Sequence, residues 1–317
     1  ALLVVTLSAF LLLGFFSGAQ RVAFQMLMAK LIPIDRRGRL QGIRNMVGGL
    51  IAAVLAWVAG HYFIEQQWLG NGYATTFLLA FLLTSVGLVV LRLGIREPDA
   101  PRLRPVLPLC DRMGQFGELL QHRDFRAFLF AHGLAAVARV GLPFWTLFIG
   151  DRLGLDGALI GSLSLAFLAA DTMSNLVWGS LGDRIGFRAV YLGSLLCSLA
   201  GLALLVSLPL LGLAPNVASL MLICTLYGAA SSCFDVAINA LGAQAERDAG
   251  RPIMSMLHGW FCVGTFSGAL AASAVAGMGI APIWHFLLVA ALFLYPLYAC
   301  YEALPDDRPE HDPARKL

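Results

Sequence analysis

Residues 73–91 read YATTFLLAFLLTSVGLVVL and contain no charged side chain. A helix needs about 20 mostly apolar residues to cross the roughly 30 Å hydrocarbon core of a bilayer, and this run, extended to residue 95, is long enough. The whole chain of 317 residues is 59% hydrophobic and 13% charged, with a mean hydropathy of +0.77. Soluble domains carry about 25% charged residues, so apolar surface here must face lipid. The composition excludes an ordinary water-soluble enzyme and predicts an integral membrane protein.

Eight further apolar runs lie on both sides of this segment, and each is bounded by charged residues, proline or glycine. Because backbone groups in lipid must be satisfied within the segment, such runs are expected to be helices. The predicted fold class is therefore all-α, a polytopic membrane helix bundle. The nine predicted spans cover residues 2–29, 42–63, 73–95, 124–149, 157–181, 188–208, 216–243, 254–276 and 281–302.

The positions of the 22 Lys and Arg residues support nine spans and indicate their direction. Nineteen of them fall in, or at the span ends beside, connections that nine spans place on one face, whereas Arg152 alone lies on the other face and Arg21 and Arg139 lie deep within spans. Cytoplasmic loops carry an excess of Lys and Arg. We therefore expect the chain to start outside and to end with a cytoplasmic C-terminus, in the inner (plasma) membrane of a bacterium.

One connection, residues 97–123, is long and contains four prolines. We interpret it as a cytoplasmic linker between two helix bundles. The predicted domains are therefore three spans of a first bundle in residues 1–96, the linker, a six-helix bundle in residues 124–302, and a cytoplasmic tail in residues 303–317.

Two cytoplasmic connections, residues 29–39 and 243–251, resemble each other. Each follows a span with a central amide, Gln25 or Asn239, and each precedes a glycine-rich span. Internal repetition of this kind, here with a period of six helices, is typical of secondary transporters. Chance similarity between two short basic loops is the alternative.

Residues 179–188 read GSLGDRIGFR and form a very short cytoplasmic turn between two spans. The pattern G-x-x-x-D-R-x-G-x-R resembles the signature loop of the major facilitator superfamily (MFS) of transporters. The resemblance extends over residues 2–302 and implies that the nine spans match helices four to twelve of a presumed twelve. It thus implies an N-terminally truncated chain.

In that family the signature loop latches the cytoplasmic gate, and the resemblance implies this role for Gly179, Asp183, Arg184, Gly186 and Arg188. From the residues alone, Gly179 permits close helix approach and Gly186 a tight turn. Asp183 can accept hydrogen bonds from nearby arginines or a helix N-terminus. The alternative is a turn whose arginines only follow the cytoplasmic bias of basic residues.

Four charged side chains stand out well inside the predicted spans: Arg21, Arg139, Asp171 and Asp235. A charge at mid-membrane costs about 2.5–3.5 kcal/mol even on lenient scales, so each needs a partner or a water-filled cavity. Arg139 and Asp171 both lie near the midplane and could pair. Asn239 lies one helical turn after Asp235.

The family resemblance implies that Arg21, Arg139 and Asp235 face a central cavity. It implies that Asp171 lies one layer of helices behind that cavity. The predicted substrate and proton pathway consists of Arg21, Gln25, Arg139, Asp171, Asp235, Asn239 and His258. The alternative for each is that it holds helices together without contacting a ligand. His132 shares a helix face with Arg139, and Asn175 lies one turn after Asp171. For these two residues we favour the alternative of a role in holding helices together.

The leading functional hypothesis is a secondary active transporter that moves a small polar or anionic organic solute by alternating access. The arginines indicate an anionic group on the solute, and Asp171 or Asp235 would exchange a proton. Residues 45–60 lack the proline of the antiporter pattern in this family, which favours proton symport. A sugar or drug efflux carrier of the same fold and a non-transporting receptor or scaffold remain alternatives.

Enzymatic chemistry is not expected. Asp171 and Asp235 lack the sequence contexts of intramembrane aspartyl proteases, and neither H-E-x-x-H nor G-x-S-x-G occurs. The six cysteines form no C-x-x-C pair or zinc-spaced cluster, so we expect no metal site and no cofactor. A formal charge of +3 without a basic stripe excludes nucleic acid as a partner. The expected partners are a small-molecule substrate, protons and the lipid bilayer.

Overall fold

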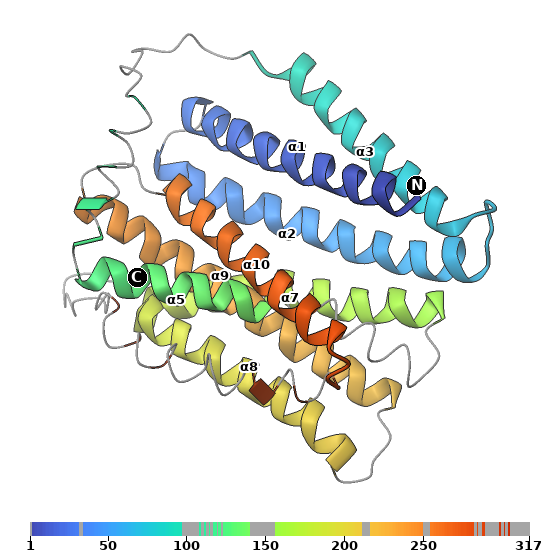
Figure 1. The fold of residues 1–317 in the computed structure, drawn as a ribbon. Helices are drawn as coiled ribbons and strands as arrows, with labels where there is room; N and C mark the ends of the chain where they lie inside the picture. The colour runs from blue at the N-terminus through green and yellow to red at the C-terminus, as the bar shows by residue number, and fades with distance from the viewer. Residues whose placement is uncertain are drawn as a thin grey trace. The chain divides into compact units, whose positions relative to one another are not determined.

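A computed structural model describes residues 2–31, 34–96, 123–139, 156–210, 216–249 and 254–281, together with residues 108, 111, 114, 117–118, 120–121, 284, 287–288, 298, 301 and 304. The elements in these ranges are helices, which confirms the all-α prediction (Figure 1). They are α1 (Leu2–Leu31), α2 (Ile34–Val58), the π-helical segment η1 (Ala59–Glu65), α3 (Gly72–Gly94), α5 (Arg123–Arg139), α7 (Gly157–Ile185), α8 (Phe187–Leu210), α9 (Val217–Ala249) and α10 (Met254–Gly277).

Six of the described helices are long and apolar enough to cross a membrane. Their apolar segments are Leu3–Gln20, Ile43–Glu65, Gly72–Gly94, Gly157–Ile185, Val217–Glu246 and Met256–Gly277, and α8 contains a shorter one, Phe187–Ser198. The span predicted at 124–149 begins as α5, but its second half lies outside the described residues, as does nearly all of 281–302. The count of nine therefore stays a prediction.

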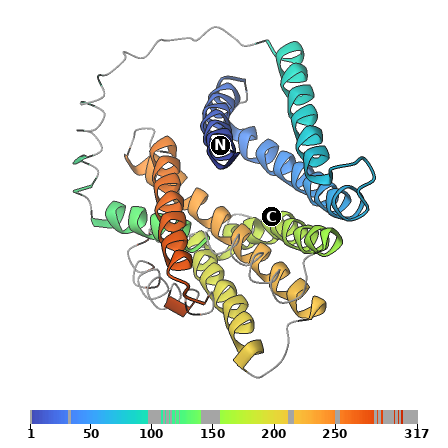
Figure 2. The same ribbon diagram turned by 45° about the vertical axis from the view of Figure 1, so that its right-hand side comes forward.

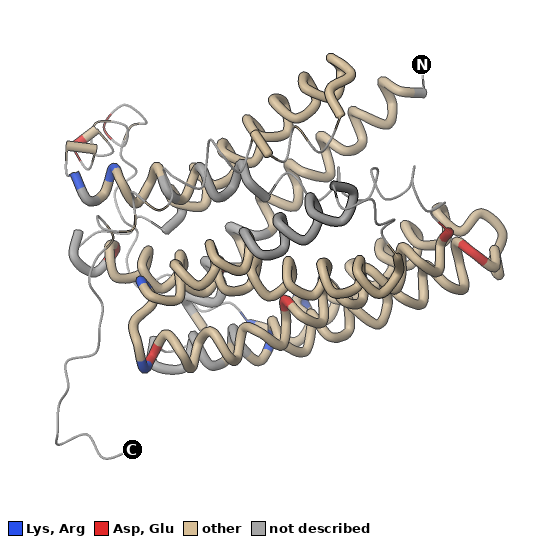
Figure 3. The backbone as a smooth tube through the Cα atoms, turned by 90° about the horizontal axis from the view of Figure 1, so that it is seen from below, with Lys and Arg blue, Asp and Glu red and all other residues tan. Residues whose placement is uncertain are grey.

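The surfaces of these helices are apolar. Phe81 and Leu93 on α3 are 66% and 80% exposed, and α1 exposes Leu11 and Phe15 in the same way. Charged residues are sparse along the described helices (Figure 3). Large apolar side chains exposed over whole helices are suited to lipid rather than to water.

Three helices begin at side chains that accept hydrogen bonds from backbone amides. Asn71 accepts from the Ala74 amide at 3.1 Å, Asp156 from the Leu159 amide at 2.6 Å, and Asn216 from the Ser219 amide at 2.8 Å. These short polar side chains satisfy amides that have no intrahelical partner at the start of α3, α7 and α9.

The chain divides into two compact units, Ala1–Arg44 with Leu78–Leu107 and Asn45–Phe77 with Pro108–Leu317. In the first unit, the Arg44 guanidinium lies 4.8 Å from the centre of the Phe24 ring. In the second, α9 packs between α7 and α8, and α10 packs against α5 (Figures 1 and 2). The division into bundles and linker drawn from the sequence stays a prediction.

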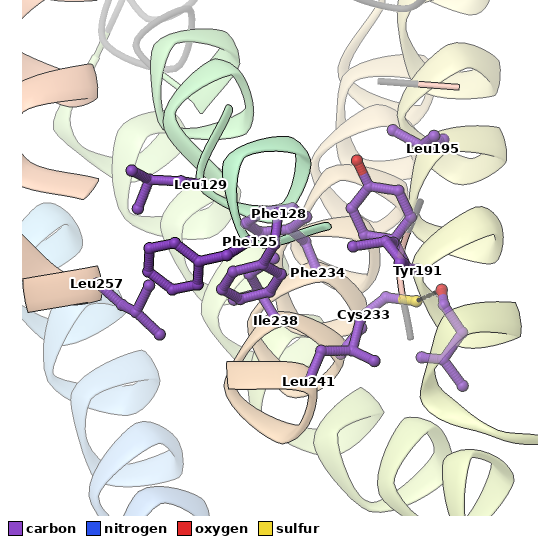
Figure 4. Packing of buried hydrophobic residues seen from close by; sticks show 13 residues of the cluster. Phe125, Phe128, Leu129, Tyr191, Leu195, Cys233, Phe234, Ile238, Leu241 and Leu257 are labelled. Atoms are coloured by element: carbon purple, nitrogen blue, oxygen red, sulfur yellow. Dashed lines mark hydrogen bonds between the residues drawn. The ribbon is translucent and has the colours of Figure 1, made fainter. Parts of the chain in front are cut away.

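A buried apolar cluster joins α5, α8, α9 and α10 in the second unit (Figure 4). Phe128 of α5 faces Phe234 of α9, and Tyr191 of α8 is completely buried. The Cys233 thiol donates a hydrogen bond to the Val190 carbonyl, with 3.0 Å between sulfur and oxygen. Because lipid tails are as apolar as these side chains, close packing rather than escape from water holds such helices together.

Candidate functional site

The contact between α7 and α9 determines where Asp171 lies. A Cβ atom built on Gly228 of α9 would lie 3.0 Å from the Asp171 amide nitrogen and 3.1 Å from the Ala170 Cβ. The Trp178 indole N–H donates to the Ala229 carbonyl at 2.9 Å. Because glycine lets two helices approach closely, the backbone at Asp171 packs directly against α9.

Each of the two intramembrane aspartates is half-buried and has an amide one helical turn later. The Asn175 Nδ2 group donates to the Asp171 carbonyl at 2.7 Å, and the Asn239 Nδ2 group donates to the Asp235 carbonyl at 2.7 Å. These are bonds to the backbone of the same helix. They place a polar side chain one turn beyond each carboxylate, Asn175 half-buried and Asn239 exposed.

The other predicted pathway residues are less closely defined. His258 is exposed on α10. Arg21 and Gln25 belong to α1 and Arg139 ends α5, but their side chains lie outside the described part of the chain, as does any pairing of Arg139 with Asp171. The pathway as a whole stays a prediction.

His132 on α5 lies in an aromatic box that sequence reasoning did not foresee. It is only 5% exposed, and its ring centre lies 6.1 Å from that of Phe128, 6.5 Å from Phe234 and 5.5 Å from Phe261. Only Phe128, one turn before His132 on α5, could have been recognised as a ring partner from the sequence. The rings from α9 and α10 come from more than one hundred residues away. The box joins three helices around one ionisable ring.

The predicted gate turn has the backbone that its glycines allow. Gly186 has φ +90° and its amide donates to the Gly182 carbonyl at 2.8 Å, ending α7. Gly182 is buried against the Phe187 ring. A Cβ built on Gly179 meets no described atom within 4 Å. Among the described residues, the close contact in this turn is thus that of Gly182 with the Phe187 ring, and close helix approach at Gly179 stays a prediction.

Arg188 contacts the C-terminal segment. Its Nε–H donates to the Tyr301 carbonyl at 3.0 Å, and its guanidinium carbon lies 4.5 Å from the centre of the Tyr301 ring. Leu304, three residues further on, is 3% exposed and belongs to the buried cluster. Asp183 and Arg184, in contrast, are exposed. Arg188 thus attaches the end of the last predicted span to the gate turn.

Among the residues that the structure describes, no group of three or more His, Cys, Asp or Glu side chains is placed to hold a metal ion. The site consists of carboxylates, amides and aromatic rings on packed helices.

Comparison with known proteins gives a family and two sequence relatives. The sequence profile of the Major Facilitator Superfamily matches residues 128–317. An uncharacterised MFS-type transporter of Yersinia pestis is 32% identical over 171 residues, which are 53% of this chain and 43% of that protein. An uncharacterised transporter of Sinorhizobium fredii is 33% identical over 134 residues, 42% of this chain and 34% of that protein. The chain thus matches less than half the length of either relative.

One solved structure is similar over most of the chain. It is a bacterial homologue of the human lysosomal transporter Spinster, in an inward-facing and unoccupied conformation. The TM-score is 0.44 and the identity 12%, over 89% of this chain and 75% of that one.

Proposed function

Because the chain belongs to the major facilitator superfamily, a family of membrane transporters, we propose that it moves a small solute across the bilayer by alternating access. The observation that carries the proposal is the family match over residues 128–317. The matched region contains both aspartates that lie within predicted spans, Asp171 and Asp235. The apolar surfaces of the described helices support a place in the membrane.

We propose proton coupling because the two half-buried carboxylates stand on helices that are long and apolar enough to cross the bilayer. A carboxylate at the depth of the hydrocarbon needs a partner, and a proton is a partner that it can bind on one face and release on the other. A conformational cycle that exposes it to each face in turn would move that proton. Asp171 or Asp235 is the proposed carrier.

The proposed solute is a small organic anion. Arg21 and Arg139 supply the positive charge for it, with Gln25, Asn239 and His258 as polar neighbours on the path. Symport is the proposed direction, in the inner membrane of a bacterium with the C-terminus in the cytoplasm. A neutral sugar or drug is the second candidate, because two aspartates would neutralise two arginines.

Uptake into proteoliposomes tests the proposal. We expect a pH gradient to drive accumulation of one member of a panel of labelled organic anions, sugars and drugs. Asp171→Asn or Asp235→Asn should abolish this accumulation but leave exchange of labelled for unlabelled solute without a gradient, because exchange needs no net proton movement. Asp111→Asn, at an exposed position in the predicted linker, is the matched control and should accumulate solute normally.

Each other outcome identifies an alternative. Accumulation that ignores the pH gradient contradicts proton coupling, and normal uptake by both aspartate variants and by Arg139→Ala contradicts the proposed site. A protein that moves no solute is a receptor or scaffold. Cleavage of a membrane peptide would indicate an enzyme.

A further inference from the structure

The first amide of α7 is bonded to a side chain from an element 92 residues earlier. The Gly157 N–H donates to Glu65 Oε2 at 2.7 Å in a partly buried position. Helix N-termini have free N–H groups and a positive dipole end that a carboxylate complements. This end of α7 already has a local cap, since Asp156 accepts from the Leu159 amide. The Glu65 bond therefore ties two elements together rather than merely starting a helix.

Glycine on both elements brings their backbones into contact beside this bond. A Cβ atom built on Gly60 would lie 2.6 Å from the Gly161 Cα, and one built on Gly157 would lie 2.7 Å from the Glu65 amide nitrogen. A Cβ on Gly161 would lie 3.1 Å from the Gly60 Cα. A side chain at Gly60 or Gly157 would force the two elements apart, so only glycine there lets the Glu65 carboxylate reach the α7 amide.

The contact continues along α2. Gly49 lies against Thr172 of α7, where an added Cβ would be 3.0 Å from the Thr172 Cβ, and Thr172 is 4% exposed. Leu176, one turn further on α7, is 59% exposed. The two elements are therefore antiparallel over the described contacts, which run from Gly49 beside Thr172 to Glu65 beside Gly157.

The sequence places the end of η1 and the start of α7 on the outer face of the membrane, because both lie far from the basic connections. A carrier that works by alternating access must close and reopen this face in every cycle. The Glu65 side chain is exposed overall. It can thus exchange its bond to Gly157 for bonds to water, and a hydrogen bond exchanged with water has a modest net free energy.

We propose that Glu65 is a latch that holds the outer ends of α2–η1 and α7 together when the outer face is closed, and that breaking its bond to the Gly157 amide lets that face open. This inference rests on the proposed transport function. Glu65 is a positioning residue, since it acts on the conformation and not on the solute.

Distances between spin labels test the latch. The labels go on bioorthogonal amino acids at Trp68, which follows η1, and at Val217, which begins α9, a helix packed against α7; both positions are exposed. In liposomes without solute, Glu65→Ala should raise the ratio of long to short distances about tenfold, equivalent to about 1.4 kcal/mol. Asp156→Ala, which removes only the local cap of the same helix, is the matched control and should leave the ratio unchanged.

Two further variants keep the test decisive if Glu65→Ala folds poorly. Glu65→Gln retains an acceptor oxygen but no charge, and should give a smaller shift in the same direction. Gly60→Ala should also lengthen the distances, whereas Gly48→Ala should not, because a Cβ on Gly48 meets no described atom within 4 Å. Unchanged distances in Glu65→Gln and Gly60→Ala, or an equal shift in Asp156→Ala, would overturn the latch.

The distance measurement and the transport assay can contradict the latch and the transport function independently. If the labels move as expected but no solute crosses the bilayer, the latch stands and the transport function is wrong. If solute exchange is normal while Glu65→Ala leaves the distances unchanged, the function stands and the latch is wrong.

Discussion

Two arginines of one short turn have different surroundings. The Arg188 guanidinium lies over the Tyr301 ring and its Nε–H bonds to the Tyr301 carbonyl, whereas Arg184 is exposed. A planar guanidinium can stack on an aromatic ring and donate in its plane at the same time, which a lysine ammonium cannot do. At the scale of the residue, equal charges therefore have unequal structural roles.

Substituting these arginines should separate the two roles. Arg188→Ala removes a charged hydrogen bond and a cation–π contact, and should lower the free energy of unfolding by about 2 kcal/mol. Arg184→Ala should change it by less than about 0.5 kcal/mol, as exposed substitutions usually do. Thermal or denaturant unfolding in detergent micelles measures both. Equal losses in the two variants would contradict the attachment of the C-terminal segment by Arg188.

At the scale of the element, α7 and α9 meet at Gly228. Replacing this glycine by alanine stabilises an isolated helix by about 1 kcal/mol, but the new Cβ would press on the α7 backbone beside Asp171. Because backbone cannot move aside as a flexible side chain can, overpacking should outweigh the gain. We expect Gly228→Ala to lower the free energy of unfolding by about 2 kcal/mol and to reduce solute uptake by displacing Asp171.

Gly193 on α8 offers the matched control for that prediction. A Cβ built there would lie 3.9 Å from the Cys233 sulfur, an ordinary van der Waals distance. Gly193→Ala should therefore be neutral or stabilising by up to about 1 kcal/mol. Unfolding measured under the same conditions decides the comparison, and a stable Gly228→Ala protein would show that α7 and α9 can separate without loss.

At the scale of the whole molecule, the predicted spans place Trp68 and Arg184 on opposite faces. Three predicted spans, 73–95, 124–149 and 157–181, lie between them, and an odd number of crossings changes the face. Both side chains are exposed, Trp68 by 71%. We expect a membrane-impermeant maleimide to label Trp68→Cys in intact cells and Arg184→Cys only after permeabilisation. The parent protein controls for its native cysteines, and labelling of both variants in intact cells would contradict the topology.

Parts of the candidate site could be predicted because their signals are local. The gate turn is a ten-residue pattern, and Gly186 has the positive φ that its position in that turn requires. The position of Asn239 one turn after Asp235 follows from helical spacing alone. The contact of Gly182 with the Phe187 ring could not be predicted in this way, since spacing in one helix does not show which face a neighbouring ring covers.

The order of residues in the chain was enough to establish an all-helical membrane protein and its family signature, because hydropathy, helix length and a contiguous motif are properties of neighbouring residues. Only the tertiary structure could bring Glu65 to the Gly157 amide, Arg188 to Tyr301 and three phenylalanine rings around His132. Apart from Phe128, the partners come from different helices. Their contacts depend on how the backbones pack, and hydropathy is nearly the same on every face of a helix that lies in lipid.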